Sequence, residues 1–436
     1  MSRVAHRLPE AIPIAIHGDD AGVFEKSKIL VLMMHSVIVE QSTSDMCLLL
    51  AVLPYEFVIE DVTLPQLYDV IAWSLCAADW GRHPRFDSTG ERMTGQRARV
   101  AGQPLAAGFQ LSFSWQEGDW KFTKETYHLR AYGHSSCCHL RGATKQGVTS
   151  YKNHTLAAPW RRTARVSLKD FDARLCSMPC AVPFAHIPGF SHLRIAIDSM
   201  HCSDLGFALR VHGSVIVWLA RRMYFGNERM SIRLQRLYSK YQQWCRANTI
   251  SSRCNMFTTE NLHVRSGVVF TAAKAADSRQ LTNFVYCLIR DDIVPNYENT
   301  PELRMVHCLC WGLHQYYELV YRNDFFLCNK TQDDIRIAVT TALENFSALS
   351  AVHLQLGEPE LFACKPKDHQ LLHLAEDWCR FTHINPRFTC CYKPEDFVRI
   401  IKRMSVKVDR RALPARVCEH FLCRAGYRWA EIRDGV

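Results

Sequence analysis

The sequence has no apolar run long enough to cross a bilayer. Its longest apolar runs, Ile29–Met34 and Val215–Ala220, fall far short of the roughly 18–20 residues that a membrane-spanning helix needs. Internal repeats and low-complexity tracts are also missing, which excludes solenoids and scaffold arrays. The first ten residues carry charges with no apolar stretch behind them, so we expect no secretory signal.

Several motifs of well-known enzyme classes are missing too. The sequence has no Gly-x-Ser-x-Gly, no phosphate-binding glycine-rich loop, no His-Glu-x-x-His and no dinucleotide fingerprint after the first expected strand. These absences argue against the serine hydrolases, nucleotide-binding enzymes and metalloproteases that depend on such motifs. Catalysis by a cysteine–histidine pair stays open, but nothing in the pattern selects one pair.

What is present is a large and weakly basic globular chain. Its 436 residues are 48% hydrophobic and 11% aromatic, enough to bury a core of two to three domains or one fold with a long insertion. The net charge of +10 weakly favours polyanionic partners. Nineteen cysteines without a secretory signal predict a reducing, intracellular compartment in which thiols stay free or bind metal.

Hydrophobic periodicity predicts an α/β fold followed by a long helical block. Expected strands cover residues 11–16, 29–35, 47–53, 109–115, 194–198 and 387–392. Expected helices cover residues 64–80, 120–129, 204–222, 231–246, 278–290, 302–321, 333–356 and 394–404. The order of three strands, helix, strand, helix and helical block matches the first half of a ribonuclease H-like sheet. We therefore predict a ribonuclease H-like mixed sheet interrupted by a long, mainly helical insertion.

Acidic residues follow two of the expected strands. Asp19 and Asp20 end the first strand, and Asp119 ends the fourth. Carboxylates held at strand ends can bind divalent cations through their oxygens. A turn at Asp19 and a helix cap at Asp119 are the alternative explanations. In a ribonuclease H-like arrangement the first and fourth strands are neighbours, so Asp19 and Asp119 could share two Mg²⁺ ions about 3.5–4 Å apart.

A third acid and a cysteine–histidine group complete the candidates. Glu395 and Asp396 begin the helix after the expected strand 387–392, where acidic residues also complement the helix dipole. His369 and His373 stand four residues apart on a helix, a good spacing for one metal ion, although two exposed histidines would look the same. The remaining candidates are the neighbouring thiols Cys137 and Cys138 and the acid Asp198.

Taken in order, these motifs resemble the DDE transposases of the CACTA, Mirage and Chapaev group, relatives of the V(D)J recombinase catalytic subunit. The resemblance spans about residues 10–405 and rests on six short motifs: His17-Gly18-Asp19, Gly118-Asp119, the Cys138 region, Asp198-Ser199-Met200-His201, His369/His373 and Glu395. It implies a catalytic triad of Asp19, Asp119 and Glu395, with Asp20, Asp396 and Asp198 as substitutes.

The resemblance also implies a zinc knuckle, in which Cys138 matches the first cysteine and His369 and His373 match the histidine pair. Arg141 stands where the family has its second cysteine, which predicts weakened zinc binding, and Cys137 is the nearest substitute. The implied cofactors are two catalytic Mg²⁺ or Mn²⁺ ions and this Zn²⁺. DNA is the implied partner, together with a second copy of the chain, and the implied location is the nucleus, with no membrane association.

The implied activity is metal-dependent DNA strand cleavage and transfer. The alternatives are a catalytically inactive, transposon-derived DNA-binding or interaction protein and an unrelated two-metal nuclease. Because only ten residues precede Ala11, we expect no separate module that reads transposon ends, which favours a degenerate or truncated member. Basic segments such as Trp160–Arg165, Lys365–Lys367 and Arg399–Arg403 could contact phosphates, with Trp160 or Trp378 stacking on an unpaired base.

These motifs divide the chain into four segments. Residues 10–132 would form the first part of a ribonuclease H-like catalytic core, and residues 133–192 a basic, knuckle-like segment rich in cysteine and histidine. Residues 193–364 would form the mainly helical insertion. Residues 365–436 would carry the histidine pair and the C-terminal part of the core.

Overall fold

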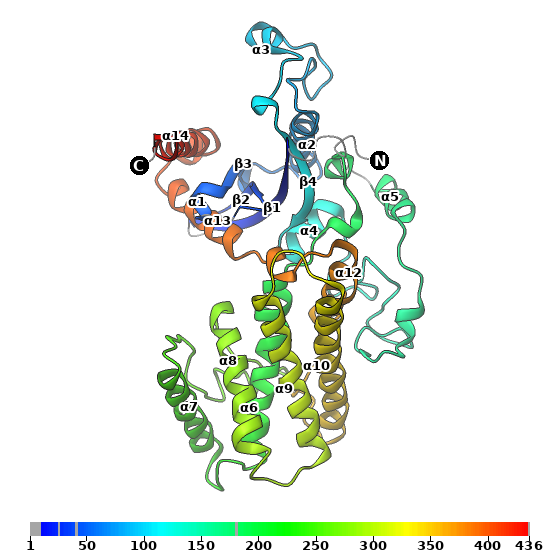
Figure 1. Ribbon diagram of the computed structural model, residues 1–436, viewed down its shortest axis with the longest axis vertical. Helices are drawn as coiled ribbons and strands as arrows, with labels where there is room; N and C mark the ends of the chain where they lie inside the picture. Colours follow the sequence, from blue (N-terminus) through cyan, green and yellow to red (C-terminus); the bar gives the residue numbers. More distant parts are fainter. Residues whose placement is uncertain (1–9, 25–26, 40–41, 179–181, 435–436) are drawn as a thin grey trace. The chain divides into compact units, whose positions relative to one another are not determined.

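The computed structural model describes residues 10–24, 27–39, 42–178 and 182–434. The chain divides into two compact units (Figure 1). Unit 1 comprises Met1–Ala131, Val166–Ala196 and Cys391–Val436, and unit 2 comprises Tyr132–Arg165 and Ile197–Cys390. This division differs from the four predicted segments, because residues 166–196 belong with the first segment and residues 365–390 belong with the helical insertion.

Unit 1 is built on a four-stranded mixed sheet. Its strands are β1 (Ala11–Phe24), β2 (Ser27–Ser36), β3 (Cys47–Pro54) and β4 (Gln110–Glu117), in the order β3-β2-β1-β4. β1 pairs antiparallel with β2 and parallel with β4, and β2 pairs antiparallel with β3. The first and fourth strands are therefore neighbours, as the sequence pattern predicts. Residues 29–33 of β2 are all buried, because a strand covered on both faces needs a continuous apolar run.

Helices cover both faces of this sheet and give three layers. On one face Ile14 and Ile16 of β1 pack in a core with α2 (Thr63–Trp80), α4 (Trp120–Tyr127) and α5 (Leu168–Cys176). On the other face Ala21 and Val23 of β1 pack in a core with α13 (Tyr392–Ser405) and α14 (Leu413–Asp434). Figure 1 shows α13 and α14 on one side of the strands and α4 on the other. The mixed α/β class predicted from the sequence is observed.

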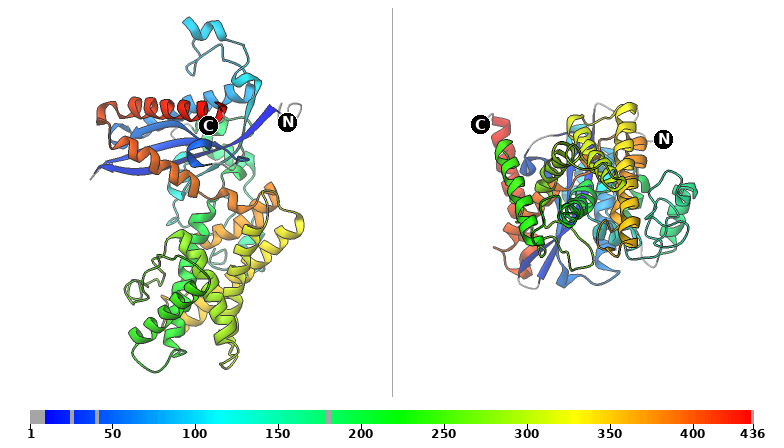
Figure 2. Two further views of the ribbon diagram at one scale, coloured as in Figure 1. Left: turned by 60° about the vertical axis from the view of Figure 1, so that its left-hand side comes forward. Right: turned by 90° about the horizontal axis from the view of Figure 1, so that it is seen from below.

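Unit 2 is a bundle of long helices. The views in Figures 1 and 2 both show α6, α8, α9 and α10 running side by side. The bounds are α6 (Ala208–Arg221), α7 (Met230–Ala247), α8 (Ala275–Cys287), α9 (Pro301–Arg322), α10 (Asn329–Gln355), α11 (Pro366–His373) and α12 (Cys379–Thr382). Residues 208–220 of α6 are all buried, and its buried polar side chains are hydrogen-bonded: Arg210 to Asp368, and His212 to Thr282. Across the described ranges, no helix is both long and apolar enough to span a membrane.

Two predicted strands are wrong. Residues 387–392 are not a strand, because a 3₁₀ helix occupies Pro386–Thr389. Pro386 lacks a backbone N–H, and the side chain of Asn385 accepts from the Arg387 N–H and donates to the Val320 carbonyl, so local bonds replace a strand ladder. Residues 194–198 form only a single parallel bridge, from Ile195 to Gln116 of β4.

Candidate functional site

The register between β1 and β4 places two acids at equivalent positions. Ile16 pairs with Gln116 and His17 pairs with Glu117, so the same offset carried two residues further aligns Asp19 with Asp119. β4 ends at Glu117, so Asp119 lies just beyond its strand, whereas β1 continues to Phe24 and Asp19 pairs with Val31 of β2. The prediction that Asp19 ends its strand, and the alternative of a turn there, are both wrong, because the antiparallel pairing with β2 extends the strand past these residues. The spacing of the two acids in the sequence thus becomes a side-by-side placement in the fold.

A pair of glycines permits this close approach. Gly118 has a φ of 153°, and a Cβ atom there would lie 2.6 Å from Cδ1 of Phe122 and 3.2 Å from the carbonyl oxygen of Gly18. A Cβ at Gly18 would overlap the ring of Phe122. The ring, which comes from the first turn of α4, therefore packs directly against backbone that precedes both acids.

Asp19 lies in an electronegative, half-buried position. Burial raises the pKa of Asp19 to about 7, the backbone N–H of Asp20 opposes the rise, and the negative charges of Asp119 and Glu395 add to it. Burial is the main cause of the raised pKa, and the neighbouring negative charges contribute less. The three acids of the predicted triad all belong to unit 1, and both Asp119 and Glu395 act electrostatically on Asp19.

Asp119 also caps a helix, so the alternative explanation considered from the sequence holds. Its Oδ1 accepts a hydrogen bond from the N–H of Phe122 at 2.7 Å, at the start of α4. The cap engages one of the two carboxylate oxygens and fixes the orientation of the side chain. Capping and cation binding are therefore compatible roles for this carboxylate.

The substitutes named from the sequence make other contacts. Asp20 accepts hydrogen bonds from the Tyr55 hydroxyl at 2.5 Å and from the Lys121 ammonium. Asp396 forms an ion pair with Arg399, one turn further along α13. Asp20 and Asp396 thus each have a cationic side chain as a partner.

Glu395 occupies the first turn of α13, the helix that packs against β1. It is half-buried, and its charge contributes to the raised pKa of Asp19. The ligand atoms of Asp19, Asp119 and Glu395 are nevertheless more widely spaced than those of the cysteine–histidine cluster. Within the described residues, only Cys138, His369 and His373 have ligand atoms that all lie within 4.8 Å of one another.

A buried ion pair beside the acids escaped the sequence reasoning. His35 of β2 and Glu117 of β4 approach to 2.6 Å between Nε2 and Oε1, and the indole of Trp115 donates to the other carboxylate oxygen at 3.1 Å. Burial lowers the pKa of His35, but the charge and hydrogen bond of Glu117 outweigh it and leave the pKa raised. The signal available in the sequence was a histidine near the end of an apolar strand, at His35, and an acid at the end of another strand, at Glu117.

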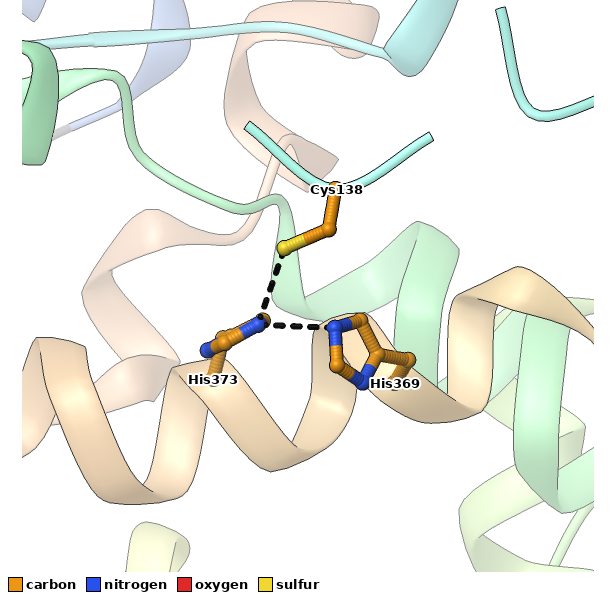
Figure 3. A group of neighbouring side chains, drawn as sticks. All are labelled: Cys138, His369 and His373. Atoms are coloured by element: carbon orange, nitrogen blue, oxygen red, sulfur yellow. Dashed lines mark hydrogen bonds between the residues drawn. The ribbon is translucent and has the colours of Figure 1, made fainter. Parts of the chain in front are cut away.

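The second candidate site belongs to unit 2 and is shown in Figure 3. The Sγ of Cys138 lies 3.2 Å from Nε2 of His373, which in turn lies 2.9 Å from Nε2 of His369. Both histidines project from α11 one turn apart, and both are buried. The side chains point toward one common position, which is the arrangement that one thiolate and two imidazoles need to bind a single ion.

Neighbouring groups orient this cluster. Nδ1 of His373 contacts Oδ2 of Asp377 at 2.5 Å, the carboxylate–histidine contact that commonly supports metal ligands. The backbone N–H of Arg141 donates to Sγ of Cys138 at 3.3 Å, while its guanidinium donates to the carbonyl of Arg161 at 2.9 Å. Arg141 thus stabilises this loop, and its side chain supplies no ligand to the cluster.

The start of α11 is held by a buried ion pair. Arg210 of α6 and Asp368 of α11 are both almost fully buried, and the guanidinium contacts both carboxylate oxygens, at 2.9 Å for the Nη1–Oδ2 pair. Asp368 precedes His369 directly, so the pair fixes the helical turn that presents the first histidine. The ring of Trp160 packs edge-on against His369, with 4.5 Å between centroids.

The predicted stacking of Trp160 or Trp378 on an unpaired base is wrong, because both indoles are buried. Trp160 is 1% exposed and Trp378 is 5% exposed, so neither indole can stack on a base. Arg161 pairs with Glu376, and Arg165 pairs with Asp377. These basic side chains are used inside unit 2 to support the cysteine–histidine cluster.

The remaining predicted residues are Cys137 and Asp198. Cys137 is buried and is not part of the cluster, and burial, followed by the charge of Cys138, raises its thiol pKa to about 11. Asp198 belongs to unit 2, where it forms an ion pair with His201 and accepts a hydrogen bond from the N–H of Met200 at 2.9 Å. These contacts give Asp198 a local structural role at the start of a helix.

No protein-family model matches the chain, and no curated protein has a significantly similar sequence.

Proposed function

We propose that the chain is a transposase-derived protein with a ribonuclease H-like core that carries out metal-dependent DNA strand cleavage and transfer. The observation that carries the proposal is the alignment of Asp19, within β1, with Asp119, just beyond the end of the parallel strand β4, together with the charge of Glu395 that helps to raise the pKa of Asp19. Three neighbouring carboxylates offer the oxygen ligands that divalent cations bind.

The topology of the sheet supports the ribonuclease H-like assignment. Three antiparallel strands are followed by a fourth strand parallel to the first, and helices cover both faces. The segment Ile197–Cys390 of unit 2 interrupts unit 1 just before the helix that carries Glu395. A long insertion ahead of the third acid is what the resemblance to this transposase group implies.

The chemistry of the donors fits Mg²⁺ or Mn²⁺ in unit 1. Asp19, Asp119 and Glu395 would hold the ions, which when bound would activate an attacking water or DNA 3′-hydroxyl and stabilise the leaving oxygen. The chain's own residues prepare the site: the cap to Phe122 orients Asp119, and the packing of α13 on β1 presents Glu395.

The cysteine–histidine cluster fits Zn²⁺ with three protein ligands, Cys138, His369 and His373. Asp377 would keep His373 in the orientation needed for binding through Nε2. We assign this site a structural role in unit 2, and we expect its affinity to be lower than that of a four-ligand site.

One observation favours an inactive, DNA-binding descendant as the second candidate. Arg141 places a guanidinium, which cannot bind a cation, where the family pattern has a thiolate. A weakened zinc site would soften the helical unit and lower catalytic output. For both candidate functions, we propose that the protein binds DNA, forms a dimer with a second copy of the chain and is located in the nucleus.

Two matched pairs of variants test the function in a plasmid nicking and strand-transfer assay with Mn²⁺. Asp19→Asn and Glu395→Gln should abolish cleavage. The adjacent Asp20→Asn and Asp396→Asn should retain it, because these carboxylates pair with Lys121 and Arg399. Cleavage that survives Asp19→Asn would contradict the proposed site, and binding without cleavage by the unmodified protein would favour the inactive candidate.

A further inference from the structure

The segment between α2 and β4 forms an arm that extends away from the sheet of unit 1, with α3 (Gly95–Val100) near its tip (Figures 1 and 2). We name residues 82–107 the arginine arm. It contains five arginines and no lysine, against only two acidic residues. The five are Arg82, Arg85, Arg92, Arg97 and Arg99, and all are exposed.

The arm is an ordered structure. At its base the His83 N–H donates to the Gln103 carbonyl at 2.9 Å, and the Gly102 N–H donates to the His83 carbonyl at 2.9 Å. Further out, the Met93 N–H donates to the Arg85 carbonyl at 3.0 Å. Oδ1 of Asp87 closes the turn by accepting from two backbone N–H groups. An arm with its backbone fixed in this way loses little conformational entropy on binding.

The structure pairs none of these arginines with an acidic side chain of the described residues. No ion pair joins any of the five to a carboxylate within the ranges that the structure describes. The side chain of Arg82 donates to the carbonyl of Gly102 at 2.8 Å, which uses it in the base of the arm. The other four leave their guanidinium groups facing solvent, and guanidinium is the side chain best suited to paired hydrogen bonds with phosphate.

We propose that the arginine arm binds the phosphate backbone of duplex DNA. A lipid surface fits it less well, because α3 has only six residues and the arm, described throughout, has one well-exposed large apolar side chain, Phe86 at 54% exposure. A protein partner would need more apolar anchors than this. The choice of DNA rests on the proposed function, but the arm is separate from the acidic site and would bind without cleavage.

The test measures binding of a fluorescent duplex by the full chain in EDTA over a series of salt concentrations. The arm variant carries Arg85→Gln, Arg92→Gln, Arg97→Gln and Arg99→Gln, and keeps Arg82 because of its bond to Gly102. The matched control removes the same number of exposed arginines from unit 2. These control substitutions are Arg229→Gln, Arg246→Gln, Arg253→Gln and Arg265→Gln.

We expect the arm variant to bind at least about tenfold more weakly near physiological salt. Its plot of log affinity against log salt should be shallower by about 2–4, since each phosphate contact contributes roughly 0.9 to the slope. The control should bind like the unmodified chain, and circular dichroism should be the same for all three.

The possible results separate the inference from the function. Equal losses in arm and control variants, or no loss in the arm variant, would overturn the role of the arm while leaving the acidic site to the cleavage assay. Tighter binding of duplex RNA, or of vesicles containing anionic lipid, would overturn the choice of DNA. Absence of any DNA binding by the unmodified chain would overturn both the arm and the proposed function.

Discussion

A substitution at Gly18 tests whether Phe122 packs directly against the backbone that precedes Asp19 and Asp119. In a Gly18→Ala variant the new methyl group would overlap the ring of Phe122 and lie 2.8 Å from Cδ2 of Leu32. Both neighbours are buried, so the strain cannot be relieved by rotation into solvent. Overpacking of this kind costs about 1–3 kcal/mol. We expect unit 1 to lose stability by that amount.

Two further variants make this prediction specific. Gly22→Ala is the matched control, because Gly22 lies in the same strand and a Cβ there would meet nothing within 4 Å; we expect a change within about 0.5 kcal/mol. Phe122→Ala alone should cost about 3–5 kcal/mol. Combined with Gly18→Ala it should cost less than the sum of the single changes, by about 1 kcal/mol or more, because the cavity accepts the methyl group.

Because the chain has two units, one global unfolding curve would mix their stabilities. Native-state hydrogen exchange of peptides from β1 and β4 reports unit 1 alone. Two results would show that the Phe122 ring does not pack against this backbone. One is that peptides of Gly18→Ala exchange at the same rate as those of Gly22→Ala. The other is that adding Phe122→Ala restores none of the stability lost in Gly18→Ala.

Three further predictions concern unit 2. Arg141→Cys should raise the zinc content measured by atomic absorption, because the Arg141 backbone N–H already lies 3.3 Å from Sγ of Cys138; an unchanged content would argue against a zinc site. Burial lowers the pKa of His212 to about 3, so the unfolded chain takes up this proton first and the stability of unit 2 falls as the pH drops below about 6.5. His212→Gln should remove about 2 kcal/mol of the loss between pH 7 and 5, measured by native-state hydrogen exchange of peptides from α6; an unchanged pH profile would contradict this. Arg210→Met should cost about 3–5 kcal/mol, because it leaves the buried Asp368 charge unpaired; a loss below about 1 kcal/mol in the same assay would show that the pair is not structural.

The sheet could be predicted well because its strands carry strong local signals. The apolar run 29–33 and the alternation after Phe109 correspond closely to β2 and β4, and the offset between Asp19 and Asp119 follows once the strands are paired in parallel. The cluster of Cys138, His369 and His373 could be proposed from helical spacing plus a resemblance. Its geometry still needed the fold, because more than 200 residues separate the thiol from the histidines.

The rest depends on tertiary contacts that local patterns do not encode. The segment 387–392 resembles a strand, but Asn385 and Pro386 turn it into a 3₁₀ helix. The sequence around Arg161 suggests a phosphate contact, but the fold pairs this side chain with Glu376, which is distant in the sequence. The ion pair of His35 and Glu117 was missed for the same reason, since each residue alone also fits a solvated strand edge.

Anomalous diffraction from crystals soaked in Mn²⁺ can show whether Asp19, Asp119 and Glu395 form one cation site. We expect anomalous density bounded by these three carboxylates in the unmodified protein, lost in Asp19→Asn and retained in Asp20→Asn. Mn²⁺ density at Asp20 or Asp396 instead, or no density in unit 1 at a Mn²⁺ concentration that supports cleavage, would show that the three acids do not form this site.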